Sequence, residues 1–273
     1  MKKIFAYDLD GTLFVKDNSM HADTPEALAK VQKSGHYNVI STGRALNNII
    51  QALGDKINLF EYILGSNGSI LYEVKTGQVR IFAKVNLDAF DLALQTTKDS
   101  DFLLRVDTPT NSLWYINNLS SAKWVDKQNR MDLAKVLNLA TLEQTQNFAK
   151  QNKDNIIQIA LRGDKTEIYQ VYEKYQSLIG ANYEVKYTNE VYIDINGLNN
   201  NKWSGLKQVA ELAKIDIANI VTFGDSGNDV EMLKNAGLGI AMGNGTFEAK
   251  SAAKKIIGAN DTNAIATTIT ELI

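Results

Sequence analysis

The order of short apolar runs along the chain constrains the fold more than any other feature of the sequence. Near the amino terminus these runs alternate with amphipathic segments, which predicts strands and helices in turn. The predicted strands lie at 4–7, 37–40 and 62–64, and the predicted helices at 24–34 and 44–53. The alternation returns later, with strands at 191–195, 219–223 and 238–241 and helices at 202–214 and 227–235. Such alternation is typical of a parallel, doubly wound α/β sheet, so we expect an α/β core assembled from both ends of the chain.

The middle of the chain follows a different pattern, because its predicted strands come in pairs. The predicted elements are a helix at 87–98, strands at 101–106 and 112–117, helical stretches near 130–150, a strand at 156–161, a helix at 165–178 and a strand at 182–187. Paired strands with flanking helices favour an α+β unit. We therefore predict a core domain of residues 1–83 and 188–273, with an inserted α+β domain of residues 84–187. Within the core, Asn67-Gly68 lies between short apolar runs and predicts a tight hairpin.

Charge and composition exclude several classes of protein. The 29 Lys and Arg residues nearly balance the 31 Asp and Glu residues, so the chain has no basic field for nucleic acid. No apolar run reaches the roughly 18 residues that span a bilayer, and the run before Asp8 is too short for a secretory signal. The absence of cysteine leaves no disulfide or thiolate metal site. These features predict a cytoplasmic protein with no nucleic-acid or membrane partner and no evident obligate protein partner.

Four polar clusters follow predicted core strands. They are Asp8–Thr12, Ser41–Arg44, the loop Asn199–Lys202, and Gly224–Asp229. In open α/β sheets, ligands bind outside the carboxyl ends of the strands. We therefore expect all four clusters to meet at one edge of the sheet, although they span more than half of the sequence.

The first cluster places two carboxylates, Asp8 and Asp10, one residue apart at the end of a strand. Two close carboxylates repel each other unless a cation or a shared proton relieves them. Mg²⁺ takes oxygen ligands and is usually held by one or two carboxylates together with substrate phosphate, and aspartate is a covalent nucleophile in aspartyl-phosphate chemistry. Gly11 allows the backbone to approach a ligand closely. The alternative is that both acids are ordinary strand-end residues.

The second and third clusters contain candidate phosphate ligands. Thr42 offers a hydroxyl and Gly43 an unobstructed backbone N–H at a helix start, both of which suit a phosphate oxygen; ordinary capping by Ser41 or Thr42 is the alternative. Lys202 opens a predicted helix, where its charge opposes the helix dipole, so a partner anion would explain it. A solvated surface lysine is the alternative reading.

The fourth cluster, "GDSGND" at 224–229, is a polar turn between a strand and a helix. Asp225 and Asp229 could form an oxygen-rich metal site with the first cluster, or could only cap the helix. Taken together with DLDGT, the metal-site interpretation is the stronger one.

Together the clusters resemble a known family. DLDGT (8–12), STGR (41–44), Lys202 and GDSGND (224–229) are similar to the four motifs of the haloacid dehalogenase-like phosphatases. The late AMGN (241–244), SNG (66–68) and the large insert resemble the Cof-type branch, which has a C2-type cap. The resemblance implies a Rossmann-like core with a cap that selects the substrate. One departure is the "LNNN" before the lysine, where the family often has a glycine-containing turn.

The resemblance also implies a role for each motif residue. Asp8 would be the nucleophile and a metal ligand, and Asp10 the general acid/base, with its backbone carbonyl on the metal. Asp225 would be a metal ligand, with Asp229 supporting the metal from nearby. The transferring phosphoryl group would be bound by the Leu9 backbone, Thr42, Gly43, Lys202 and Asn228.

These roles describe a Mg²⁺-dependent phosphatase that hydrolyses a small phosphorylated metabolite, such as a sugar phosphate, through an aspartyl-phosphate. Two alternatives share the motifs: a phosphotransferase or phosphomutase that uses the same intermediate, and a non-catalytic sensor of a phosphorylated ligand. The sequence names neither the physiological substrate nor the cap residues that would select it.

Overall fold

The computed structural model describes residues 1–15, 17–122, 124 and 139–273. The chain forms two compact units, which we call the first unit (Met1–Phe82 and Asn200–Ile273) and the second unit (Ala83–Asn199). The sequence predicts that the second part of the core domain begins at residue 188. In the structure the segment 188–199 belongs to the second unit, because its strand β10 (Tyr192–Gly197) pairs with two strands of that unit.

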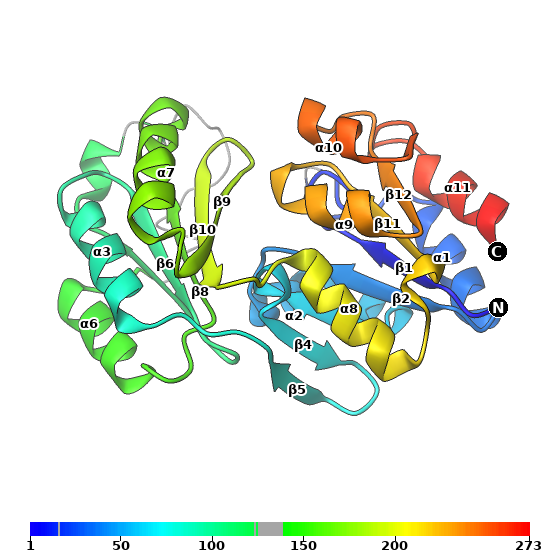
Figure 1. The fold of residues 1–273 in the computed structure, drawn as a ribbon, viewed down its shortest axis with the longest axis horizontal. Helices are drawn as coiled ribbons and strands as arrows, with labels where there is room; N and C mark the ends of the chain where they lie inside the picture. Colours follow the sequence, from blue (N-terminus) through cyan, green and yellow to red (C-terminus); the bar gives the residue numbers. More distant parts are fainter. Residues whose placement is uncertain (16, 123, 125–138) are drawn as a thin grey trace. The chain divides into compact units, whose positions relative to one another are not determined.

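The first unit is built on an eight-stranded sheet in the order β13-β12-β11-β1-β2-β3-β4-β5 (Figure 1). These strands are β1 (Ile4–Tyr7), β2 (Tyr37–Ser41), β3 (Tyr62–Gly65), β4 (Ile70–Glu73), β5 (Gln78–Ile81), β11 (Ile220–Gly224), β12 (Leu238–Ala241) and β13 (Lys255–Ile256). The strands from β13 to β3 are parallel, whereas β4 and β5 are antiparallel additions at one edge. The predicted parallel α/β core is confirmed, and β1 and β11 lie side by side although about 210 residues separate them.

Helices cover both faces of this sheet, as a doubly wound fold requires. They are α1 (Thr24–Lys33), α2 (Leu46–Leu53), α8 (Lys202–Ala213), α9 (Val230–Asn235), α10 (Phe247–Ala252) and α11 (Ala264–Leu272). Leu206 of α8 and Met232 of α9 pack with Ile4 and Ala6 of β1 on one face. The other face meets α1, where Asn38 Nδ2 of β2 donates a hydrogen bond of 2.9 Å to the Leu28 carbonyl. Every residue of β1 is buried, which explains its unbroken apolar run.

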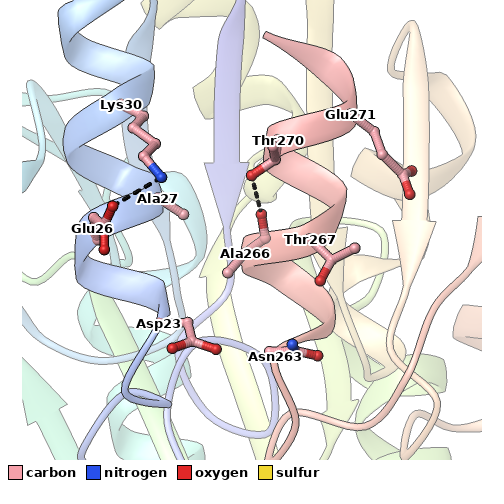
Figure 2. Close-up of a pocket in the computed structure, with 9 residues that line it drawn as sticks. All are labelled: Asp23, Glu26, Ala27, Lys30, Asn263, Ala266, Thr267, Thr270 and Glu271. Carbon is pink, nitrogen blue, oxygen red and sulfur yellow. Dashed lines mark hydrogen bonds and ion pairs between the residues drawn. The ribbon is translucent and has the colours of Figure 1, made fainter.

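Helices α1 and α11 are neighbours, and a groove of about 420 Å³ runs between them. Figure 2 shows its lining, in which Lys30 pairs with Glu26 at 2.9 Å and Thr270 bonds back to Ala266. None of the residues of the four polar clusters lines this groove. This groove therefore lies away from the chemistry that the sequence predicts.

The second unit is an antiparallel sheet in the order β7-β6-β8-β10-β9, with helices α3, α6 and α7. Its other elements are β6 (Leu103–Asp107), β7 (Ser112–Ile116), β8 (Gln158–Arg162), β9 (Tyr183–Thr188), α3 (Leu87–Lys98), α6 (Leu142–Gln151) and α7 (Lys165–Ile179). Alternate residues of each strand, such as Leu104, Ile159 and Ile193, join the apolar core that these helices cover. The intervening residues of β8, β9 and β10 are mostly polar, whereas Leu103 and Ile116 on the same second face join a smaller apolar cluster with Ala122 and Trp124.

Several element boundaries differ from the predictions. The predicted hairpin at Asn67-Gly68 is confirmed, with Gly65 opposite Ile70 in the β3–β4 pair. Helix α2 begins at Leu46 rather than at residue 44. Of the helical stretches predicted near 130–150, residues 130–138 lie outside the described residues, and α6 begins at Leu142.

Within the described part of the chain, no helix combines the length and apolarity needed to cross a bilayer. The cytoplasmic location and the absence of nucleic-acid and obligate protein partners stay predictions.

Candidate active site

The polar clusters come together at the carboxyl edge of the parallel strands, as the positions of the clusters predicted. Asp8 follows β1 directly, and its backbone N–H donates to Phe223 of the neighbouring strand β11 at 3.0 Å. Thr42 follows β2, and Asp225 follows β11. Lys202 is the first residue of α8. This edge therefore collects residues from four separate stretches of sequence.

Lys202 lies at the centre of the site. Its side chain is completely buried, and Nζ lies 2.6 Å from Oδ1 of Asp8 and 2.6 Å from Oδ1 of Asp229. A buried ammonium group is costly unless carboxylates compensate it, so the two acids explain why a lysine can occupy a helix start. The partner anion predicted for Lys202 is thus supplied by the chain itself. The surface-lysine alternative is wrong.

Asp229 is fully engaged by protein groups. Oδ1 accepts from Lys202, and Oδ2 accepts from the backbone N–H groups of Asp225 and Ser226, both at 2.9 Å. Gly224 allows this approach, because a Cβ there would come within 2.6 Å of the Asp229 side chain. Asp229 therefore shapes the loop after β11 and has little coordination capacity left for an ion.

Asp8 and Asp225, by contrast, each keep an oxygen outside these bonds. Oδ2 of Asp8 has no hydrogen-bond partner among the described residues, and neither has Oδ2 of Asp225, whose Oδ1 accepts from Thr12 Oγ1 at 2.7 Å. Gly11, with φ of +82°, passes so close that a Cβ would lie 2.5 Å from Asp225. The glycine of DLDGT is therefore required by the close approach of Asp225.

The buried charges do not balance within the chain. Asp8, Asp225 and Asp229 offer oxygens within 4.8 Å of one another, and one ammonium group faces three carboxylates. Burial raises the pKa of Asp225 to about 7, with the nearby Asp229 as the next cause. Burial also raises the pKa of Asp8 well above its usual range; Lys202 opposes this shift, and the neighbouring acids add to it. An all-oxygen site with excess negative charge fits a hard divalent cation such as Mg²⁺.

Burial would lower the pKa of Lys202, but the charges of Asp229 and Asp8 outweigh this and raise it. The lysine therefore stays protonated and contributes a permanent positive charge beside Oδ1 of Asp8.

Asp10 lies outside the buried cluster and is held by Arg44. The guanidinium donates from Nε to Oδ2 at 2.7 Å and from Nη2 to Oδ1 at 2.5 Å, which is a two-pronged contact. Arg44 is held in turn by Asn18 Oδ1 at 2.6 Å and lies over the Phe14 ring at 5.3 Å. This bidentate contact, which we call the Arg44 fork, fixes the plane and direction of the Asp10 carboxylate.

The predicted phosphate ligands fall into two groups. Leu9 follows Asp8 in the loop after β1, and Lys202 contacts Asp8 directly. Thr42 and Asn228 are joined through Asn67, whose backbone N–H donates to the Thr42 carbonyl at 2.9 Å and whose side chain accepts from Asn228. Gly43 lies in the loop before α2 rather than at the helix start.

Sequence reasoning assigned no role to several residues that shape the site. They are Thr12, Arg44, Asn67 and Asn244, the last of which donates to the Gly11 carbonyl at 2.8 Å. Each lies inside a motif that the sequence analysis had quoted, so position in a motif was the available signal. The contacts themselves join residues 34 to 233 positions apart, and no local pattern predicts such pairs.

Comparison with known proteins decides the family. The model of the haloacid dehalogenase-like hydrolases matches residues 5–269, nearly the whole chain. The chain belongs to this family. The resemblance carried by the four motifs is therefore confirmed, and the enzyme class follows as a hydrolase of this family.

The relatives of this haloacid dehalogenase-like hydrolase include proteins named as phosphatases. A 5-amino-6-(5-phospho-D-ribitylamino)uracil phosphatase of Bacillus subtilis, YcsE, is 25% identical over 268 residues, covering 98% of this chain and 94% of the relative. The pyridoxal phosphate phosphatase YbhA of Escherichia coli is 29% identical, with 97% and 96% covered. A haloacid dehalogenase-like hydrolase from Bacteroides thetaiotaomicron has the same fold, with a TM-score of 0.81 at 20% identity over all of both chains.

The raised pKa of Asp225 predicts a pH-dependent stability of the metal-free protein. From the ordinary carboxyl value near 4 up to about 7, the folded protein holds a proton that the unfolded chain has released. The free energy of unfolding contributed by this group therefore falls as the pH rises through that range. Asp225→Asn keeps an acceptor for Thr12 and removes the titration, so in chelator it should be more stable than the unmodified protein at pH 7.5 and little different at pH 5.

Thermal unfolding midpoints from pH 5 to 8, with chelator or with Mg²⁺, would check this expectation. Mg²⁺ should raise the midpoint of the unmodified protein and leave that of Asp225→Asn nearly unchanged. Asp55→Asn, an exposed acid in the same unit, is the matched control and should behave like the unmodified protein. A stability difference between the Asp225 variant and the unmodified protein that stays constant across this pH range would contradict the prediction.

Proposed function

We propose that this protein is a Mg²⁺-dependent phosphatase that hydrolyses a small phosphorylated metabolite through an aspartyl-phosphate on Asp8. The main support for the proposal is the hydrogen bonding of the Asp8 carboxylate, which leaves one of its oxygens available. One oxygen is held by the buried ammonium of Lys202 at 2.6 Å, and the other has no partner among the described residues. A fixed carboxylate with one available oxygen at the edge of the sheet is the geometry that a nucleophile needs.

In the proposed first step, Oδ2 of Asp8 attacks phosphorus and the bond between phosphorus and the ester oxygen breaks. Asp10 gives its proton to the departing oxygen, which leaves as an alcohol. Lys202 neutralises charge that gathers on the phosphoryl oxygens, the main requirement in phosphoryl transfer. The product of this step is a phosphate ester on Asp8.

In the second step, water attacks the same phosphorus and Asp10 accepts a proton from it. Inorganic phosphate departs, and Asp8 is again a free carboxylate. Proton transfer by a positioned acid/base contributes roughly 10²–10⁴-fold to such steps. The fork from Arg44 leaves each Asp10 oxygen a second lone pair, so the carboxylate can exchange a proton without releasing the arginine.

Asp8 and Asp225, together with the Asp10 carbonyl, would hold the cation, and Asp229 would support the loop that carries Asp225. The bound ion would stabilise the charge of the transferring group and offset the repulsion among the carboxylates. Mg²⁺ is favoured over Ca²⁺ because it demands a tight octahedron, whereas Ca²⁺ takes 6–8 ligands at longer distances.

The relatives support a small organic phosphate ester as the substrate. Their names specify a phosphorylated ribitylaminouracil and pyridoxal phosphate, which share a phosphate monoester on a compact polar molecule. We propose the same substrate class here.

We further propose that the second unit is the cap that selects the substrate. Its support is the polar face of the five-stranded sheet, opposite the face that the helices cover. On this face Arg105 pairs with Asp107 at 2.9 Å, and Gln158 and Thr188 both donate to Asp194. These groups are buried and pair with one another, whereas the neighbouring Glu184 and Lys186 are partly exposed and offer directed acceptors and donors, which discriminate between polar substrates far better than an apolar surface does.

The nucleophile role predicts that Asp8→Asn folds normally and loses at least about 10³-fold in kcat, because an amide cannot form the phosphate ester. Phosphate release from p-nitrophenyl phosphate with Mg²⁺, and mass spectrometry to detect phosphorylated protein and to check for deamidation, would test it. Asp55→Asn is the matched control. Substantial turnover by undeamidated Asp8→Asn would remove Asp8 from this role.

The fork from Arg44 predicts a dependence on the leaving group. Arg44→Lys keeps the charge but cannot hold both Asp10 oxygens, so proton transfer should suffer. We expect kcat/KM to fall about tenfold or more for an alkyl phosphate, whose leaving oxygen needs the proton, and by much less for p-nitrophenyl phosphate. Arg80→Lys, an exposed arginine on β5, is the control. Equal losses on both esters would show that Arg44 does not act through Asp10.

The cap role predicts that a change on the polar face of the second unit alters the ranking of substrates. Lys186 lies on this face, opposite Asp194, and is paired with Glu184 at 2.9 Å. Lys186→Met should change the ratio of kcat/KM between metabolite phosphates by about tenfold, the value of one charged hydrogen bond, and should spare p-nitrophenyl phosphate. Lys174→Met, on the exposed side of α7, is the matched control. An unchanged ranking across a panel of metabolite phosphates would argue against this surface.

A further inference from the structure

The turn Ser66–Gly68 has an unusual backbone. Ser66 has φ of +48°, Asn67 +52° and Gly68 +89°, so three successive residues are left-handed. Glycine adopts this conformation readily and asparagine tolerates it, but serine does so at a cost. Strained backbone of this kind persists only where its surroundings enforce it, and it gathers at functional sites.

Contacts from two of the polar clusters hold this turn. Ser66 N–H donates to the Arg44 carbonyl and Asn67 N–H to the Thr42 carbonyl, both at 2.9 Å. On the other side, Asn200 Nδ2 donates to the Asn67 carbonyl at 3.2 Å. Gly68 passes so close to the start of α8 that a Cβ would lie 2.5 Å from the Asn201 carbonyl. The turn is therefore clamped between the loop after β2 and the loop before Lys202.

The side chain of Asn67 reaches a third cluster. It is buried, and Oδ1 accepts from Asn228 Nδ2 at 2.9 Å, across 161 positions of sequence. Asn228 Oδ1 accepts from Ser226 Oγ at 2.7 Å. Both ends of the Asn228 carboxamide are therefore fixed. Its Nδ2 carries two hydrogens, and the bond to Asn67 uses one of them.

We propose that Asn67 is a positioning residue that aims the second N–H of Asn228 at the phosphoryl group and ties the three phosphate-binding loops into one rigid cradle. The inference rests on the proposed phosphatase function and adds a residue to it. Asn67 acts through Asn228 and through its own backbone rather than by touching the substrate. The left-handed turn places the backbone of Asn67 between Thr42 and Asn200 and its carboxamide against Asn228.

A pair of glycine substitutions separates the side chain from the backbone. Asn67→Gly suits the positive φ and keeps the backbone N–H, but it removes the acceptor for Asn228. Ser66→Gly makes the same kind of change one residue earlier and leaves the carboxamide in place. In the Asn67 variant we expect kcat/KM to fall and the inhibition constant of inorganic phosphate to rise, each by about tenfold, the value of one hydrogen bond. The Mg²⁺ activation constant should stay unchanged, because the hydrogen bonds of Asn67 given above run to Thr42, Asn200 and Asn228 and not to the three clustered acids.

Ser66→Gly should change kcat/KM and the phosphate inhibition constant far less than Asn67→Gly does. In an Asn228→Ala background, Asn67→Gly should cost little more, because its effect passes through Asn228. A phosphate inhibition constant like that of the unmodified protein in Asn67→Gly would overturn the proposal. So would losses that add fully to those of Asn228→Ala, which indicate direct contact, or a Mg²⁺ activation constant that rises as much as the phosphate constant, which indicates general collapse of the site. If the unmodified protein neither hydrolyses p-nitrophenyl phosphate nor is inhibited by phosphate, the proposed function itself fails.

Discussion

The buried ammonium of Lys202 is the interaction on which the rest of the site depends. It holds Asp8 and Asp229 at 2.6 Å each, and thereby joins the loop after β1 to the loop after β11 at the start of α8. A lysine with no exposure is tolerated only because both carboxylates face it. Three buried carboxylates gather here and the ammonium group contacts two of them, so the arrangement is short of positive charge and would favour a divalent cation at this edge of the sheet.

At the same edge, two glycine residues let the backbone pack directly against carboxylates. Gly11 and Gly224 each stand where a Cβ would collide with a carboxylate, so both acids lie against bare backbone. Two backbone N–H groups then hold Asp229, and the Arg44 fork holds Asp10. Each acid is oriented before any ligand arrives, which favours electrostatic catalysis because little reorganisation is needed at the moment of reaction.

The two units use their sheets in different ways. In the first unit, helices bury both faces, and chemistry is confined to the ends of the strands. In the second unit, helices α3, α6 and α7 cover one face, and alternation places Arg105, Asp194 and their neighbours on the other, beside a small apolar cluster that includes Trp124. A sheet with one polar face can vary its side chains without disturbing its core. That is why we assign selectivity to the second unit and the common chemistry to the first.

The sequence by itself determined the class of fold, the order of most elements and the composition of the four motifs, because these depend on local periodicity and on residue type. It did not determine that β10 belongs to the second unit, since strand pairing is decided by a partner such as β9 and not by the strand's own apolar pattern. It also did not determine the partners of Lys202, Arg44 and Asn67. Their bonds join residues up to 194 positions apart, and the pairing of β1 with β2 and β11 in one sheet brings those residues within reach.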